Sequence, residues 1–209
     1  MSPTKSMRFQ TLVALLAAFA GVFPGVSPGV LEAQVGPEVG SEETRVGSAA
    51  SIVVKGGQIA QENRVHFGGW AGLVFSERLA IGGGGFALLK NVNLAGPEGE
   101  TGFDLDMGYG GLMFRIWEPL GGYLTAEMGL LLGAGHAEVR QQLTGTEVGS
   151  NNFLVAEGEL GIAYGLFRSL HVGASAGYRL TSGVEDLPGV SKGDLNAFTG
   201  SLFVRLGGV

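Results

Sequence analysis

The feature of this chain that most limits its fold is a regular alternation of apolar residues with small or polar ones. In residues 170–181, leucine, valine, alanine and tyrosine occupy every second position, and histidine, glycine, serine, arginine and threonine lie between them. Because successive side chains of a β-strand point to opposite faces, this pattern predicts a strand with one apolar face. Four further segments repeat it: 64–75, 103–110, 124–134 and 154–166. The fold is therefore expected to be all-β.

Glycine dominates the face opposite the apolar residues and makes up 39 of the 209 residues. Charged residues are only 15% of the chain, so this second face is a poor match to the polar outer surface of a soluble β-sandwich. Glycine does suit the interior of a narrow barrel and the sharp bends of its strands. Open sheet edges are not tolerated in lipid, so we expect a closed up-and-down antiparallel transmembrane β-barrel.

Eight strands account for the alternating segments and the turn residues between them. They are expected near 50–60, 64–75, 78–91, 103–117, 123–142, 153–167, 170–183 and 195–208. Short connections are expected at 76–77, 118–122 and 168–169, and longer polar ones at 93–102, 144–152 and 184–194. Short turns at one rim and long loops at the other are typical of outer-membrane barrels, with the short turns on the periplasmic side.

One segment breaks the alternation. Within residues 103–117 the apolar positions shift from Tyr109 to Leu112, across Gly110 and Gly111. A β-bulge adds one residue to a strand and would produce such a shift, so we expect a bulge at these glycines. On this interpretation the apolar residues of 103–110 face lipid.

The N-terminus has the order of a secretory signal peptide. Lys5 and Arg8 precede an apolar run of about a dozen residues, and the small residue Ala33 follows two prolines. We therefore expect residues 1–33 to be a cleaved signal peptide, 34–49 a polar mobile leader, and 50–209 the outer-membrane barrel.

Composition excludes several classes of function. The chain has no cysteine, so disulfides, thiolate metal sites and a lipid-modified cysteine are excluded. The formal net charge of −6 argues against nucleic-acid binding, which needs a basic face. The expected partners are outer-membrane lipid and the barrel-insertion machinery, and the sequence does not identify a partner for the loops.

Two glycine-rich segments carry a resemblance to a known family. Residues 67–86 contain Phe-Gly-Gly-Trp-Ala-Gly and Leu-Ala-Ile-Gly-Gly-Gly-Gly-Phe, and residues 107–111 are Met-Gly-Tyr-Gly-Gly. Over about residues 50–209 the chain resembles small eight-stranded bacterial outer-membrane β-barrel proteins, in particular a family of uncharacterised barrels. The resemblance implies a fold and supplies no functional residue.

Charged residues on the glycine-rich faces predict a network inside the barrel. Buried charges have to be paired, so we expect a structural network of ion pairs that fills the lumen. Its expected members are Asp104, Asp106, Glu157, Glu159 and Arg179 toward the long loops, and Glu127, His171 and Arg205 lower down.

No catalytic, cofactor or metal site is predicted. The three histidines fall on three separate strands and lack metal-ligand spacing. His171 and Ser175 share a strand face but lie roughly 13 Å apart, too far for direct activation of a nucleophile. The glycine runs at 82–85 and 108–111 lack the Gly-Lys-Ser/Thr and helix of a phosphate loop.

The leading hypothesis is thus a non-enzymatic barrel with a role in envelope structure or surface interaction through its long loops. Three alternatives stay open: a small pore, a lipid-modifying barrel enzyme, and a soluble periplasmic barrel whose apolar faces point inward to hold a ligand.

Several aromatic residues are candidates for membrane-interface girdles or for lumen packing. They are Trp70, Trp117, Tyr123, Tyr164 and Tyr178.

Overall fold

The computed structural model describes residues 46–59, 62–89, 92–95, 101–141, 146–184 and 195–208. These residues form nine β-strands: β1 (Val46–Ile59), β2 (Glu62–Phe75), β3 (Leu79–Leu88), β4 (Val92–Ala95), β5 (Thr101–Gly121), β6 (Leu124–Gln141), β7 (Glu147–Phe167), β8 (Leu170–Ser182) and β9 (Ala197–Gly208). The expected signal peptide and most of the expected leader lie outside the described residues. In the described part of the chain, no helix is long and apolar enough to cross a membrane.

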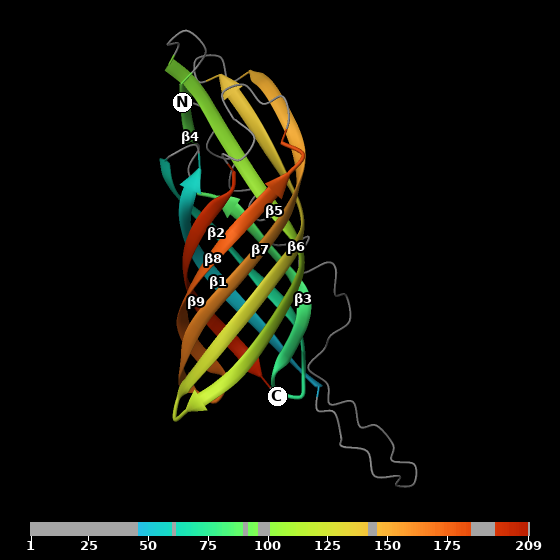
Figure 1. Ribbon diagram of the computed structural model, residues 1–209, viewed down its shortest axis with the longest axis vertical. Helices are drawn as coiled ribbons and strands as arrows, with labels where there is room; N and C mark the ends of the chain where they lie inside the picture. The colour runs from blue at the N-terminus through green and yellow to red at the C-terminus, as the bar shows by residue number, and fades with distance from the viewer. Residues whose placement is uncertain are drawn as a thin grey trace, which may run out of the picture. The chain divides into compact units, whose positions relative to one another are not determined.

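The strands form one closed antiparallel ring (Figure 1). Apart from β3 and β4, each strand pairs with its neighbours in sequence, and β1 pairs with β9 to close the wall. Both β3 and β4 pair with β5 at different heights, so these two strands occupy one position in the ring. The wall therefore has eight strand positions, and the expected eight-stranded up-and-down barrel is confirmed.

The strand limits differ from expectation at a few ends. β1 begins at Val46, so residues 46–49, which sequence analysis assigned to the leader, are part of the barrel wall. The loop expected at 144–152 is largely strand, because β6 and β7 keep pairing up to Arg140 and Glu147. The turn expected at 118–122 is shorter for the same reason, since β5 pairs with β6 as far as Gly121.

Apolar residues lie on the outside of the barrel. In 64–75, 124–134, 154–166 and 170–181 the alternate positions are exposed outward or buried inward as the sequence predicted. Leu160, for example, is 67% exposed, whereas its neighbours Glu159 and Gly161 point into the lumen. This placement is the opposite of that in a barrel built to hold an apolar ligand.

The bulge expected in β5 is wrong. Residues 108–116 pair without a register shift with both β3 and β6. From Leu105 to Trp117 the inward positions are the odd-numbered ones, and Leu105, Met107 and Tyr109 are at most 5% exposed. Along β5 the type of side chain on each face changes, whereas the alternation itself does not. Toward the long loops the outer face becomes polar and the inner face becomes apolar.

β5, β6 and β7 are the longest strands, with 21, 18 and 21 residues. They extend beyond most of the ring at the long-loop end, where the short β4 pairs with the start of β5 (Figure 1). On β5 and β6 the outer side chains of this extension are polar. In it, Arg140 donates to both carboxylate oxygens of Glu138, at 2.6 and 2.8 Å, and these bonds lower the pKa of Glu138.

Paired glycines allow neighbouring strands to approach closely on the lumen side. A Cβ atom on Gly82 would overlap the carbonyl oxygen of Ala71, and one on Gly111 would overlap that of Leu132. Gly82 lies opposite Gly72 on β2, and Gly111 lies opposite Gly133 on β6. At these positions the bent wall of a narrow barrel leaves no room for a side chain.

The β2–β3 turn provides a first stability prediction. Ser76 and Glu77 have φ values of 49° and 60°, and the Arg78 N–H donates to the Phe75 carbonyl at 3.2 Å. A two-residue turn with φ positive at both positions favours Asn-Gly. The double substitution Ser76→Asn with Glu77→Gly is expected to raise the free energy of unfolding by about 1 kcal/mol. Urea unfolding of the protein in lipid vesicles measures this change in the free energy of unfolding. Ser169→Gly, at a turn residue without positive φ, should give no gain, and equal gains would contradict the explanation.

Candidate functional site: the charged lumen

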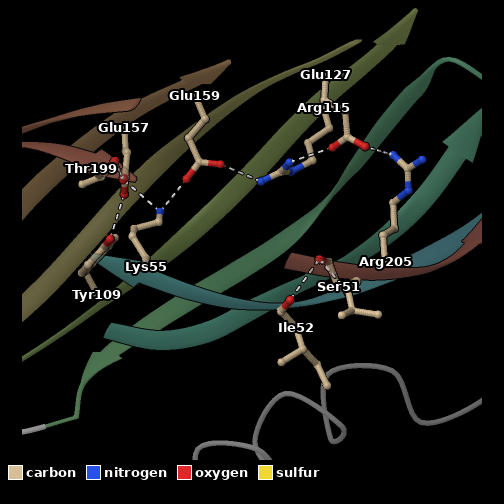
Figure 2. Close-up of polar contacts among 11 residues, drawn as sticks. Ser51, Ile52, Lys55, Tyr109, Arg115, Glu127, Glu157, Glu159, Thr199 and Arg205 are labelled. Carbon is tan, nitrogen blue, oxygen red and sulfur yellow. Dashed lines mark hydrogen bonds and ion pairs between the residues drawn. The ribbon is translucent and has the colours of Figure 1, made fainter. Parts of the chain in front are cut away.

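The upper part of the lumen network joins β7 to β1. Lys55 Nζ lies 2.9 Å from Glu157 Oε1 and 2.5 Å from Glu159 Oε1. Glu157 also accepts hydrogen bonds from Tyr109 Oη at 2.8 Å and from Thr199 Oγ1 at 3.0 Å. All five side chains point inward from the ring (Figure 2). The ammonium group is thus held between two carboxylates of the same strand.

The lower part continues the chain of charges to β9. Arg115 Nη2 lies 2.8 Å from Glu159 Oε2, and its Nη1 lies 3.3 Å from Glu127 Oε2. Arg205 Nη1 lies 2.5 Å from Glu127 Oε1. Acidic and basic groups alternate along the whole series (Figure 2). The three carboxylates and three cations of this series balance one another, as buried charges require.

The cations of the lumen also lie over aromatic rings. Lys55 Nζ is 3.8 Å from the centre of the Phe86 ring. The guanidinium of Arg205 lies 4.4 Å from the Trp117 ring, and that of Arg115 lies 5.3 Å from the Trp70 ring. Each such contact stabilises a desolvated cation by about 2 kcal/mol. The lumen is therefore filled by charged groups packed between aromatic rings.

Arg179 lies at the upper end of the network and is fully buried. Its Nε donates to the Leu195 carbonyl at 2.9 Å, and its Nη1 lies 3.4 Å from His66 Nε2. The guanidinium also lies 5.2 Å from the Tyr109 ring. Glu157 is directly opposite Arg179 in the β7–β8 register, so the two charges are neighbours across the strands.

An apolar layer closes the lumen above Arg179, toward the long loops. Its side chains are at most 5% exposed: Ile59, Leu105, Met107, Ala137, Val139, Phe153, Val155, Val184 and Leu195. We call this set the cap layer. It lies between the charged network and the loop end of the barrel, and an ion crossing it would lose its hydration among largely apolar side chains.

The structure brings together most of the residues expected in the network. Glu127, Glu157, Glu159, Arg179 and Arg205 are all buried and face the lumen. His171 faces the lumen opposite Arg205 in the β8–β9 register and is partly exposed.

The placement of Asp104 and Asp106 in the lumen is wrong. Asp106 is exposed and Asp104 is partly exposed, both on the outward face of the β5 extension. There they lie opposite Arg140 and Glu138 of β6. The error follows from assuming that the apolar face is the outer one along the whole strand.

Two central members of the network, Lys55 and Arg115, were missed from the sequence. Arg115 alternates with Phe114 and Ile116, so period two would have placed it inward. Lys55 had no such signal, because the alternation in the first strand is weak.

The aromatic candidates divide between the two faces. Trp70 and Trp117 point inward, with ring centres 6.1 Å apart. Tyr123 and Tyr164 form an outward pair, 5.7 Å apart, near the short turns. Tyr178 pairs with Phe198, 4.8 Å apart, toward the long loops. The tyrosines thus lie where interface girdles are found, and the tryptophans serve lumen packing.

The position of the tryptophans predicts a fluorescence result. The chain has two tryptophans, which are 3% and 5% exposed. Their emission is expected to be little quenched by phospholipids with brominated acyl chains, because the barrel wall separates the rings from lipid. Ile162→Trp places a ring on the outer face, where Ile162 is 56% exposed, and should add a strongly quenched component. Strong quenching of the unaltered protein would contradict the inward placement.

The histidines do not converge on a common centre. His66 contacts Arg179, whereas His136 Nδ1 lies 2.9 Å from Asn152 Oδ1 on the β6–β7 extension. Among the described residues, no group of three His, Cys, Asp or Glu side chains is placed to hold a metal ion.

The closed ring, the outward apolar residues and the charged interior define the fold of the small eight-stranded outer-membrane β-barrel proteins. The neisserial surface protein A (NspA) shares it, with a TM-score of 0.58 and 15% sequence identity over 79% of this chain and 99% of that one. Ail of Yersinia pestis gives a TM-score of 0.47 at 14% identity, covering 79% of this chain and 97% of that one. OprG from Pseudomonas aeruginosa gives 0.40 at 13% identity, covering 78% and 93%. The sequence matches no family model and no curated protein. A likeness of this kind shows the fold, and any function has to be argued from the residues.

Proposed function

We propose that this chain is a non-enzymatic protein of the bacterial outer membrane, with a packed lumen that does not conduct. Its role would be structural in the envelope, or surface interaction through the long-loop end. Secretion by residues 1–33 and insertion by the barrel machinery belong to the same proposal.

The observation that carries the proposal is an apolar belt around the outside of the barrel. On β5, the outward charges Asp106 and Glu118 are separated by eleven residues whose outward members are glycine, leucine, phenylalanine and isoleucine. The outward positions of Leu124–Ala134 on β6 and Leu154–Leu166 on β7 are likewise apolar or glycine. A tilted membrane strand needs about 9–11 residues to cross the hydrocarbon. The belt therefore has the height of a bilayer core.

The interior supports a packed lumen in place of a pore. The described carboxylates of the network are all engaged by cations, and the cap layer covers them toward the loops. Water and ions need a continuous polar path, which these two features oppose. The absence of a converging nucleophile and base among the described side chains likewise gives no support to an enzyme.

The membrane placement is tested by fractionating cells that express the full chain and running each fraction on a gel with and without boiling. The proposal expects the protein in the outer-membrane fraction, with a mobility that changes on boiling because a closed barrel resists detergent. Recovery from the periplasm without a mobility change would overturn it. Regular current steps from the purified protein in a planar bilayer would overturn the non-conducting lumen.

A further inference from the structure

The outer wall of the barrel carries a groove between two rows of side chains. The lower row follows hydrogen-bonded partners across five strands: Leu79, Ile116, Met128, Leu160 and Ala176. The upper row consists of Phe114, Leu130, Gly158 and Tyr178. The hollow between them has a volume of about 660 Å³ and is bordered almost wholly by apolar atoms. We call it the outer groove.

Two small residues give the outer groove its depth. Gly158 interrupts the upper row between Leu130 and Tyr178, and a Cβ atom placed on it would have no atom within 4 Å. Ala176 ends the lower row beside Leu160, which is 67% exposed. Large side chains thus flank a stretch of the outer surface that carries only small ones. The volume of the groove falls within the roughly 300–1,000 Å³ of ordinary ligand sites.

We propose that the outer groove seats one acyl chain of a phospholipid in a fixed position. This inference rests on the membrane placement proposed above. The groove crosses four inter-strand spacings of about 4.8 Å and is therefore about 19 Å long. A long, narrow site bordered almost wholly by apolar atoms fits a hydrocarbon chain, and lipid is what surrounds this face in a membrane.

Charge at one end of the groove indicates where the head group lies. Arg78 directly precedes Leu79, the first residue of the lower row, and its side chain is 61% exposed. It forms an exposed ion pair with Glu118 at 3.1 Å, a kind of pair that contributes little and leaves other guanidinium N–H groups to meet a phosphate. At the other end the groove finishes at Tyr178, which pairs with Phe198. A phospholipid phosphate beside Arg78 therefore suits this groove, with the acyl chain running toward Tyr178.

Native mass spectrometry of the full-length protein, extracted from membranes in mild detergent, tests the proposal. The unaltered protein should retain one phospholipid per chain. Gly158→Leu fills the low stretch of wall and should reduce the lipid-bound fraction at least fivefold. Gly108→Leu is the matched control, because Gly108 also faces outward, a Cβ on it would meet only the Phe86 carbonyl oxygen at 3.6 Å, and it lies on β5 outside the groove. It should retain lipid as the unaltered protein does. Arg78→Gln should lower retention of anionic phospholipid more than that of zwitterionic phospholipid.

Each result decides the proposal. No retained lipid, equal retention by the Gly158 and Gly108 variants, or a retained mass that matches lipopolysaccharide would overturn it. The heat-dependent gel shift is measured on the same preparations. A membrane-extracted protein with a normal shift but no retained lipid counts against the groove alone, whereas a protein recovered from the soluble fraction counts against the proposed function.

Discussion

Glu127→Leu is expected to lower the free energy of unfolding by about 3–5 kcal/mol, the usual effect of removing one partner from a buried ionic group. Glu127 Oε1 is 2.5 Å from Arg205, and Oε2 is 3.3 Å from Arg115. Arg115 would keep Glu159, but Arg205 has no second carboxylate within ion-pair distance among the described residues. The substitution thus leaves a guanidinium that is 5% exposed without a counter-charge.

Urea unfolding in lipid vesicles measures this loss, with the gel shift on boiling as an independent reading of barrel closure. The double substitution Glu127→Leu with Arg205→Met should recover a large part of the stability, because it removes the unpaired cation along with its partner. Replacing a whole buried pair by apolar groups is often neutral. A double variant no more stable than Glu127→Leu would show that the lost stability does not come from the unpaired charge.

The exposed pair of Arg78 and Glu118 supplies the matched control. Both side chains are more than half exposed, so Glu118→Gln should cost less than about 1 kcal/mol. If the Glu127 and Glu118 variants lost equal stability, the lumen charges would be behaving as solvated surface groups, and the packed lumen would be contradicted.

The sequence predicted the strands and most of their faces because membrane barrels follow period two with few exceptions. Residues 170–181 alternate without a break, and each lies on the expected side of the wall. The rule fails on β5 for a physical reason. Where this strand rises beyond the belt, water replaces lipid outside, so Asp106 faces outward and Leu105 faces inward. The side chains still alternate between the two faces there, but the polar ones face outward and the apolar ones face inward.

The network could be predicted only in part, since its pairs join residues far apart in the chain. Lys55 and Glu157 are 102 positions apart and meet because β1 closes the ring. No local pattern marks Lys55, whose neighbours Gly56 and Gly57 dilute the alternation of β1. The sequence indicates inward charges only where the alternation is regular and the outside is lipid, and the ring order decides which of them form pairs.

The small diameter of this barrel and its filled interior depend on each other. The glycine pairs on the lumen face let the strands bend closely, which leaves a small interior. That interior is then occupied by long side chains from other positions, such as Arg115 and Trp117. Outward residues carry none of this packing, so a substitution on the outer face tests the surroundings of the barrel and little else.

Leu202→Arg is therefore the sharpest test of which solvent surrounds the wall. Leu202 is 68% exposed at the middle of β9. An arginine at the bilayer midplane on the lipid face of a barrel costs about 2–4 kcal/mol, whereas one near the interface costs about 0–1 kcal/mol. Val148→Arg is the matched control, because Val148 is 45% exposed on the part of β7 that extends beyond the belt.

Both variants are compared with the unaltered protein by urea unfolding in vesicles. The expected result is a loss of about 2–4 kcal/mol for Leu202→Arg and at most about 1 kcal/mol for Val148→Arg. In water both arginines would be solvated, and neither would cost much, because no packing is lost at an exposed position. Equal and small losses would therefore mean that the apolar belt does not lie in hydrocarbon. The expected difference places the middle of β9 in the bilayer and the Val148 end of β7 beyond it.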